Sequence, residues 1–195
     1  MSGLKAPILD VLNRLKAIQV RTAEGYNQPL FVRVWNNQIA RQDDGSGYVF
    51  QRPAAFVEVI NDVAFDIIGL GVRSADLGFR IHLIHDYYNG EDMEQDLLIY
   101  DLRDTILSTN EGLSQFVPTA CGTLNCIRET AEYDHDNTYH YILDFVCNFI
   151  DSKGSKFDEE QANFVNEVTD FTDIKVVQDG IPTQTQQDNE YIIPQ

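Results

Sequence analysis

Histidine and acidic residues near the middle of the chain are the first candidates for chemistry. His82 and His85 stand three residues apart, with Asp76 and Asp86 close to them. Imidazole and carboxylate groups together can supply a general base or bind a metal. Residues three apart in a strand point to opposite faces, however, so both imidazoles cannot easily reach one ion. We therefore predict no catalytic residue here and expect His85 and Asp86 to lie on a solvated edge.

Cysteine and histidine residues later in the chain raise the question of zinc. Cys121 and Cys126 are followed by His135 and His140. The pattern contains no CxxC pair, and its histidines fall across an expected turn and strand, so we predict no metal site. Together with Cys147 the cysteines number three, an odd count that fits buried, reduced thiols better than disulfides.

The remaining motifs do not indicate an enzyme. Gly69-Leu70-Gly71 lacks the further glycine and the Lys-Ser/Thr pair of a phosphate-binding loop. No nucleophile elbow, ordered Ser/His/Asp set or Cys/His pair is evident. The prediction is a protein without catalytic residues or cofactor. A small hydrolase using the region of His82, His85 and Asp86 is one alternative, and a homo-oligomeric binding module of non-viral origin is another.

The clearest structural signal is a strand between residues 139 and 150. Its odd positions are almost all apolar, whereas its even positions include His140, Asp144 and Asn148. This alternation predicts one core face and one mixed face. A hairpin should join this strand to an extended stretch from Thr119 to Tyr133, across the polar residues 134–137.

Two amphipathic helices are expected. The first spans residues 4–18, with an apolar stripe of Leu4, Ile8, Val11, Leu12, Leu15 and Ile18. The second follows the Asn89-Gly90 turn and ends near Gly112, with Met93, Leu97, Leu98, Leu102 and Ile106 buried and Tyr100 at the flank.

Further strands are expected at residues 30–35, 54–60 and 78–88, and Trp35 should line the core or a subunit contact. Residues 62–77 lack a clean period and contain Gly69 and Gly71, which predicts a long loop with some order. The fold class is α+β, a small, mostly antiparallel twisted sheet packed by two amphipathic helices, with an extended C-terminal arm.

The length and composition of the chain predict one folded domain followed by a C-terminal arm. The chain has 195 residues, of which 43% are hydrophobic, enough for a single core that we place in residues 1–151. Residues 152–195 carry nine acidic residues against three lysines and form an acidic arm, extended or ordered by a partner. Phe157, Phe164, Val168 and Phe171 are spaced loosely as one helical face. We predict partner binding by the apolar residues Phe164, Phe171, Tyr191, Ile192 and Ile193; a partly disordered terminus is the alternative.

The charge is strongly acidic. Fourteen Lys and Arg residues face 31 Asp and Glu residues, a formal net charge of −17, which argues against a surface that grips nucleic acid or anionic lipid. A negatively charged channel wall would instead let a DNA duplex slide past without binding. The alternative is that the acidic residues only keep the protein soluble. No apolar run is long enough to cross a bilayer, and MSGLKAPILD lacks the features of a signal peptide, which predicts a cytoplasmic origin.

Several segments in this order resemble the tail-terminator and tail-completion proteins of tailed bacteriophages. After the first helix come LFVRVW, YVFQRPAAFVEV, GFRIHLIHDYY, a helix in EDMEQDLLIYDLRDTIL and a closing strand ending in YHYILDFVCNFID. The resemblance covers about the first 150 residues. The arm has no counterpart in the smallest members of the family.

The resemblance implies a structural protein of the virion rather than an enzyme. Such proteins form homo-oligomeric rings of six or twelve copies in the neck, between the portal or connector and the tail or an adjacent neck ring. Their sheets line a channel through which double-stranded DNA passes as non-specific cargo. The chain would be assembled in the host cytoplasm, with no membrane partner.

Overall fold

The computed structural model describes residues 3–21, 25–39, 49–60, 64–69, 71–86, 93–132 and 138–152, and four short strands beyond. The chain divides into two units, Met1–Ser155 and Lys156–Gln195. Within the second unit, β9 (Phe157–Asp158) pairs with β10 (Asn163–Phe164), and β11 (Val177–Gln178) pairs with β12 (Ile181–Pro182). The helical face expected through Phe157 and Phe164 is therefore wrong at these two residues, which lie in paired strands.

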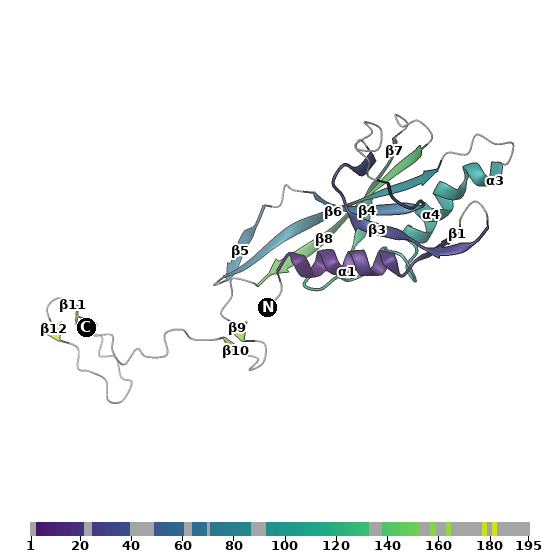
Figure 1. The fold of residues 1–195 in the computed structure, drawn as a ribbon. Helices are drawn as coiled ribbons and strands as arrows, with labels where there is room; N and C mark the ends of the chain where they lie inside the picture. Colours follow the sequence, from purple (N-terminus) through teal and green to yellow (C-terminus); the bar gives the residue numbers. More distant parts are fainter. Residues whose placement is uncertain are drawn as a thin grey trace. The chain divides into compact units, whose positions relative to one another are not determined.

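A six-stranded sheet forms the centre of the first unit (Figure 1). β6 and β8 are its longest strands, and β5 pairs with β6 outside the main strand order. β3 runs parallel to β4, and all other neighbours are antiparallel. The main order is β3 (Phe31–Val34), β4 (Ala54–Ile60), β6 (Val72–Asp86), β8 (Thr138–Asp151) and β7 (Asn125–Glu132), with β5 at Asp66–Gly69. The predicted mostly antiparallel α+β fold is confirmed.

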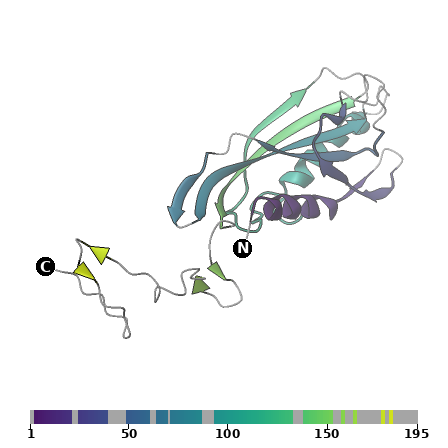
Figure 2. The same cartoon turned by 60° about the vertical axis from the view of Figure 1, so that its left-hand side comes forward.

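Two helices cover one face of this sheet, as Figures 1 and 2 show. They are α1 (Lys5–Lys16) and α4 (Leu98–Leu107), with the short α3 (Met93–Asp96) directly before α4. A small two-stranded sheet, β1 (Gln19–Arg21) with β2 (Asn27–Pro29), follows α1. In the connection between β1 and β2, Gly25 has φ +84°, a conformation that glycine adopts without strain.

The main core lies between the helices and the sheet. Leu143, Phe145, Cys147 and Phe149 of β8 are buried there, which confirms the predicted alternation. Odd-numbered residues of β6 join them, and the helices contribute Val11, Leu12, Leu15, Ile99, Leu102 and Ile106. The even-numbered residues of β6 and β8 point to the opposite face, because successive side chains alternate.

The expected loop at 62–77 is wrong for most of the residues that the structure describes. Asp66–Gly69 is β5, and β6 begins at Val72 rather than at Gly78. The cause is tertiary pairing: β6 pairs with β8 as far as Arg73, opposite Asp151. Polar residues on the uncovered face, such as Ser74 and Asp76, hide the strand pattern in the sequence.

The second helix also differs from the prediction. It is broken between α3 and α4, and it ends at Leu107 instead of near Gly112. Met93 and Leu97, expected in the buried stripe, are exposed, whereas Ile99 is buried. Ile99, Leu102 and Ile106 of α4 pack on the sheet, so the phase of α4 itself decides which of its residues are buried. No helix among the described residues is long and apolar enough to span a membrane.

Gly112 gives a direct test of the packing behind α4. A Cβ atom at this position would lie 2.2 Å from the carbonyl oxygen of Ile106 and 2.4 Å from that of Thr105. We expect Gly112→Ala to lower the free energy of unfolding by about 1–3 kcal/mol, since backbone must shift to accept the methyl group. Urea denaturation followed by circular dichroism measures this.

Gly122→Ala is the matched control. A Cβ atom there would have its nearest contact, the carbonyl oxygen of Asn148, at 3.7 Å, an ordinary distance. Its unfolding free energy should stay within about 0.5 kcal/mol of wild type. Equal effects of the two substitutions would contradict the packing argument.

Candidate functional site

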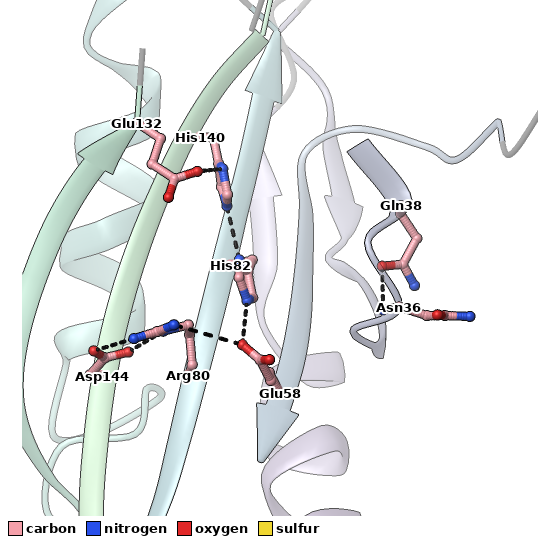
Figure 3. A network of polar contacts seen from close by, with 8 residues as sticks. All are labelled: Asn36, Gln38, Glu58, Arg80, His82, Glu132, His140 and Asp144. Atoms are coloured by element: carbon pink, nitrogen blue, oxygen red, sulfur yellow. Dashed lines mark hydrogen bonds and ion pairs between the residues drawn. The ribbon is translucent and has the colours of Figure 1, made fainter. Parts of the chain in front are cut away.

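A cluster of polar side chains occupies the sheet face opposite the helices (Figure 3). We call it the polar cluster; its members are Glu58 of β4, Arg80 and His82 of β6, His140 and Asp144 of β8, and Glu132 of β7. Strand register places them together. Arg80 lies opposite both Glu58 and Asp144, and His140 lies opposite both Ile84 and Glu132. His82 and His140 are therefore diagonal neighbours on adjacent strands.

Two histidines and two glutamates form a continuous row across the four strands. His82 Nε2 lies 3.1 Å from Glu58 Oε2, and His82 Nδ1 lies 2.9 Å from His140 Nε2. His140 Nδ1 is 2.8 Å from Glu132 Oε2, an ion-pair contact outside hydrogen-bond geometry. Both imidazoles are buried. The row therefore joins two buried rings to two partly exposed carboxylates.

Arg80 and Asp144 form a two-point ion pair beside this row. Arg80 donates from Nε to Asp144 Oδ1 at 2.7 Å and from Nη2 to Oδ2 at 3.0 Å. Its Nη1 also lies 4.0 Å from Glu58 Oε2. The hydrogen bonds to Asp144 raise the pKa of Arg80 above its usual value. Since the Asp144 side chain is almost fully buried, the guanidinium is its main compensation.

Burial governs the protonation of His82. Burial, followed by the positive charge of Arg80, lowers the pKa of His82 to about 3, against an opposing effect of Asp144. His82 is therefore a neutral imidazole at physiological pH, with one ring N–H to donate.

Trp35 covers the histidines. Its ring stacks on His82, with centroids 3.8 Å apart and planes 8° from parallel. Gln38 holds the following turn: its Oε1 accepts from the backbone N–H of Asn36 at 2.7 Å, and its Nε2 donates to the Val34 carbonyl at 2.8 Å. Trp35 also packs against a second small core of Ile39, Phe50, Ala54, Phe56 and Ile84. The prediction that Trp35 lines the core is confirmed.

His85 lies on the other face of the sheet. It lines a cavity of about 230 Å³ with residues of β1 and α4, among them Arg21, Asp101 and Leu102. It is buried, so the expected solvated edge is wrong, and burial lowers its pKa. Asp86 pairs with Arg52 at 2.5 Å. Because His82 and His85 occupy opposite faces, the site suggested for a hydrolase has no common centre.

The cysteines are free thiols. Cys147 is buried, whereas Cys121 and Cys126 are half-buried, less than expected. A hydrogen bond with Cys147, together with burial, raises the pKa of the Cys121 thiol, and burial raises that of Cys126. Within the described ranges, no group of three or more His, Cys, Asp or Glu side chains is placed to hold a metal ion.

The predicted partner-binding residues lie in the second unit. Phe164 is in β10, and Phe171, Tyr191, Ile192 and Ile193 lie outside the described residues, so their role stays a prediction. His135 also lies outside them. The first unit exposes further apolar residues that no sequence pattern indicated. Ile127 in β7 is 65% exposed at a bulge between Cys126 and Arg128, and Val34 in β3 is 54% exposed.

Breaking the Arg80–Asp144 pair tests the cluster's contribution to stability. We expect Asp144→Asn to lower the unfolding free energy by about 1–3 kcal/mol, because a partly buried guanidinium loses its carboxylate partner. Asp104→Asn is the control, since Asp104 pairs with Arg103 on an exposed surface, and its cost should stay below about 1 kcal/mol. Denaturant titrations of both variants give the comparison, and a smaller loss for Asp144→Asn would contradict it.

Comparison with known proteins adds no relative. Neither the scan against protein-family models nor the search of curated proteins found a match to this chain.

Proposed function

We propose that this protein is a structural subunit of a homo-oligomeric ring in the neck of a tailed bacteriophage, joining the portal or connector to the tail around the DNA channel. The proposal takes its biological setting from the family resemblance of the sequence. Its physical support comes from the strand edges and the uncovered sheet face of the first unit, and from the net charge of the whole chain.

The observation that carries the proposal is the exposure of apolar side chains at both outer strands. Among the described strands, β3 pairs only with β4, and β7 pairs only with β8. β3 exposes Val34, and β7 exposes Ile127. Unpaired strand edges are templates for pairing with another chain. The two edges differ, with β3 at one side of the sheet and β7 at the other, so the β3 edge of one subunit could meet the β7 edge of the next. Such a head-to-tail contact closes into a ring when the rotation between subunits permits.

The sheet face opposite the helices is partly exposed to solvent, as expected for a subunit that lines a channel. Away from Trp35, the face opposite the helices exposes Asp76 and Asn148 next to Ile150. Antiparallel sheets commonly bury one face and leave the other to solvent. Such a wall fits either a channel lining or a contact with a neighbouring ring.

The charge fits passage of DNA. A formal net charge of −17 repels phosphates, so a lumen built from this chain would offer a duplex few places to bind. This makes DNA a cargo of the ring and not a ligand of it.

Replacing Ile127 tests the ring directly. We expect the full chain to assemble, alone or when mixed with a portal partner, into particles of six or twelve times the 22.2 kDa chain mass. Ile127→Lys should shift the particles toward monomer, because it places a charge in the apolar contact. Mass photometry with negative-stain imaging measures both results.

Leu97→Lys is the control for this experiment, since Leu97 is also exposed but lies beside α4 rather than at a sheet edge. It should leave assembly unchanged. A wild-type chain that remains monomeric with every neck partner would rule out the proposed function. Equal loss from both lysine variants would rule out the edge contact.

Removal of the arm gives a separate prediction. A chain that ends before Lys153 should keep the circular dichroism spectrum of the first unit, because the described buried residues of its main core lie between Val11 and Phe149. Its rings should be weaker, since we assign the arm to clasping a neighbour. A second truncation before Thr183 isolates the contribution of Tyr191, Ile192 and Ile193. If the chain that ends before Lys153 assembles as well as the full chain, the proposed clasp is refuted.

A further inference from the structure

Two isoleucines occupy irregular positions in strands at the edges of the main sheet. The register of β5 against β6 shifts at Ile68, and the register of β7 against β8 shifts at Ile127. Each isoleucine is therefore the extra residue of a bulge, a feature that bends its strand and can turn a side chain outward. Ile68 is 57% exposed and Ile127 is 65% exposed. Both bulges thus present a large apolar side chain to the outside of the sheet.

The two strands that carry these bulges lie on opposite sides of the sheet. β6 pairs with β8 on one side, and it pairs with β4 and then with β5 on its other side. β7 pairs with the side of β8 that faces away from β6. Among the described strands, neither β5 nor β7 has a further partner. β5 therefore belongs to the same side of the sheet as β3, and β7 forms the opposite side.

The charged residues beside the two bulges have opposite signs. Asp66 precedes the bulge in β5, and Arg128 follows the bulge in β7; both residues are exposed. Neither forms an ion pair within the part of the chain that the structure describes. The carboxylate opposite Arg128 in the sheet, that of Asp144, is held by Arg80. One edge thus offers an unpaired carboxylate and the other an unpaired guanidinium, each next to an exposed isoleucine.

We propose that the β5 edge of one copy of this chain contacts the β7 edge of the next copy, with the bulge isoleucines packed together and Asp66 facing Arg128. This contact rests on the proposed function, since it specifies which strands of neighbouring ring subunits meet. Packing of the isoleucines removes apolar surface from water. The pair of opposite charges selects which edges come together.

β5 matches the β7 edge better than β3 does. β3 exposes Arg33, whose charge would repel Arg128 of the neighbouring copy. β3 also exposes less apolar surface, with Val34 at 54%, whereas β5 exposes Ile67 at 83% in addition to Ile68. Both charge and apolar surface therefore favour β5.

Contacts between two identical edges are disfavoured by the same charges. Two β5 edges would bring two copies of Asp66 into one contact, and two β7 edges would bring together two copies of Arg128. Like charges across an interface suppress such pairing. Unlike edges therefore meet, and a contact of this head-to-tail kind closes into a ring.

The position of the bulges along the strands also constrains the ring. Ile68 follows the residue opposite Arg73, whose partner on β8 is Asp151, whereas Ile127 follows the residue opposite Phe145. The two bulges thus lie at different points along the β6–β8 pair. In a closed ring, the rotation that carries one copy onto the next leaves heights along the ring axis unchanged. Bulges that touch must share one height, so the strands of each subunit are inclined to the ring axis.

Charge reversal in the full chain tests this contact. Arg128→Asp alone and Asp66→Arg alone each place like charges across it. Where wild type assembles, alone or with a portal partner, each single variant should raise about tenfold the concentration at which half of the copies are assembled. The double variant restores opposite charges and should return this concentration to within about twofold of wild type. Mass photometry over a dilution series measures it.

Arg128→Asp combined with Glu111→Arg is the matched control. It has the same net charge as the double variant, and Glu111 is exposed but lies outside both edges. This control should assemble as poorly as Arg128→Asp alone. If wild type assembles but the double variant is not restored, or the control is restored equally, the β5–β7 contact is overturned and the ring itself is not. A wild-type chain that never assembles refutes the proposed function, and this contact with it.

Discussion

The antiparallel pairing of β6 with β8 is the constraint on which the rest of the structure depends. It runs without interruption from Arg73 opposite Asp151 to Asp86 opposite Thr138, and an ion pair between Arg73 and Asp151 joins its end. Because side chains alternate along both strands, this one register sorts them into a face that packs on α1 and α4 and a face that carries the polar cluster. A shift of one residue would exchange the two faces.

Much of the fold could be predicted from local patterns. The alternation of residues 139–150 and the helical stripe of residues 4–18 are strong because each element has one apolar side. The start of β6 could not be predicted in this way. Ser74 and Asp76 face solvent, and the glycines at 69 and 71 indicated a loop, whereas pairing with β8 makes the segment a strand. Likewise, the break before α4 moved Leu97 out of the buried stripe expected for it.

The polar cluster was less accessible to sequence reasoning. The rule that His82 and His85 point to opposite faces was sufficient to separate them. It could not bring His82 to His140, because these residues are 58 positions apart and meet only through strand register. Their burial depends on Trp35, which the sequence placed only in general terms. Pairing across strands is set by the whole sheet, and a single sequence does not reveal it.

The stacking of Trp35 on His82 has a practical consequence. Trp35 is the chain's one tryptophan, and it packs on the sheet face away from the helices. Indole fluorescence excited selectively would therefore report the environment of that face alone. Backbone signals report all strands and helices together. Comparing the two optical signals during denaturation would reveal whether the two sides of the sheet lose their packing in one step or in sequence.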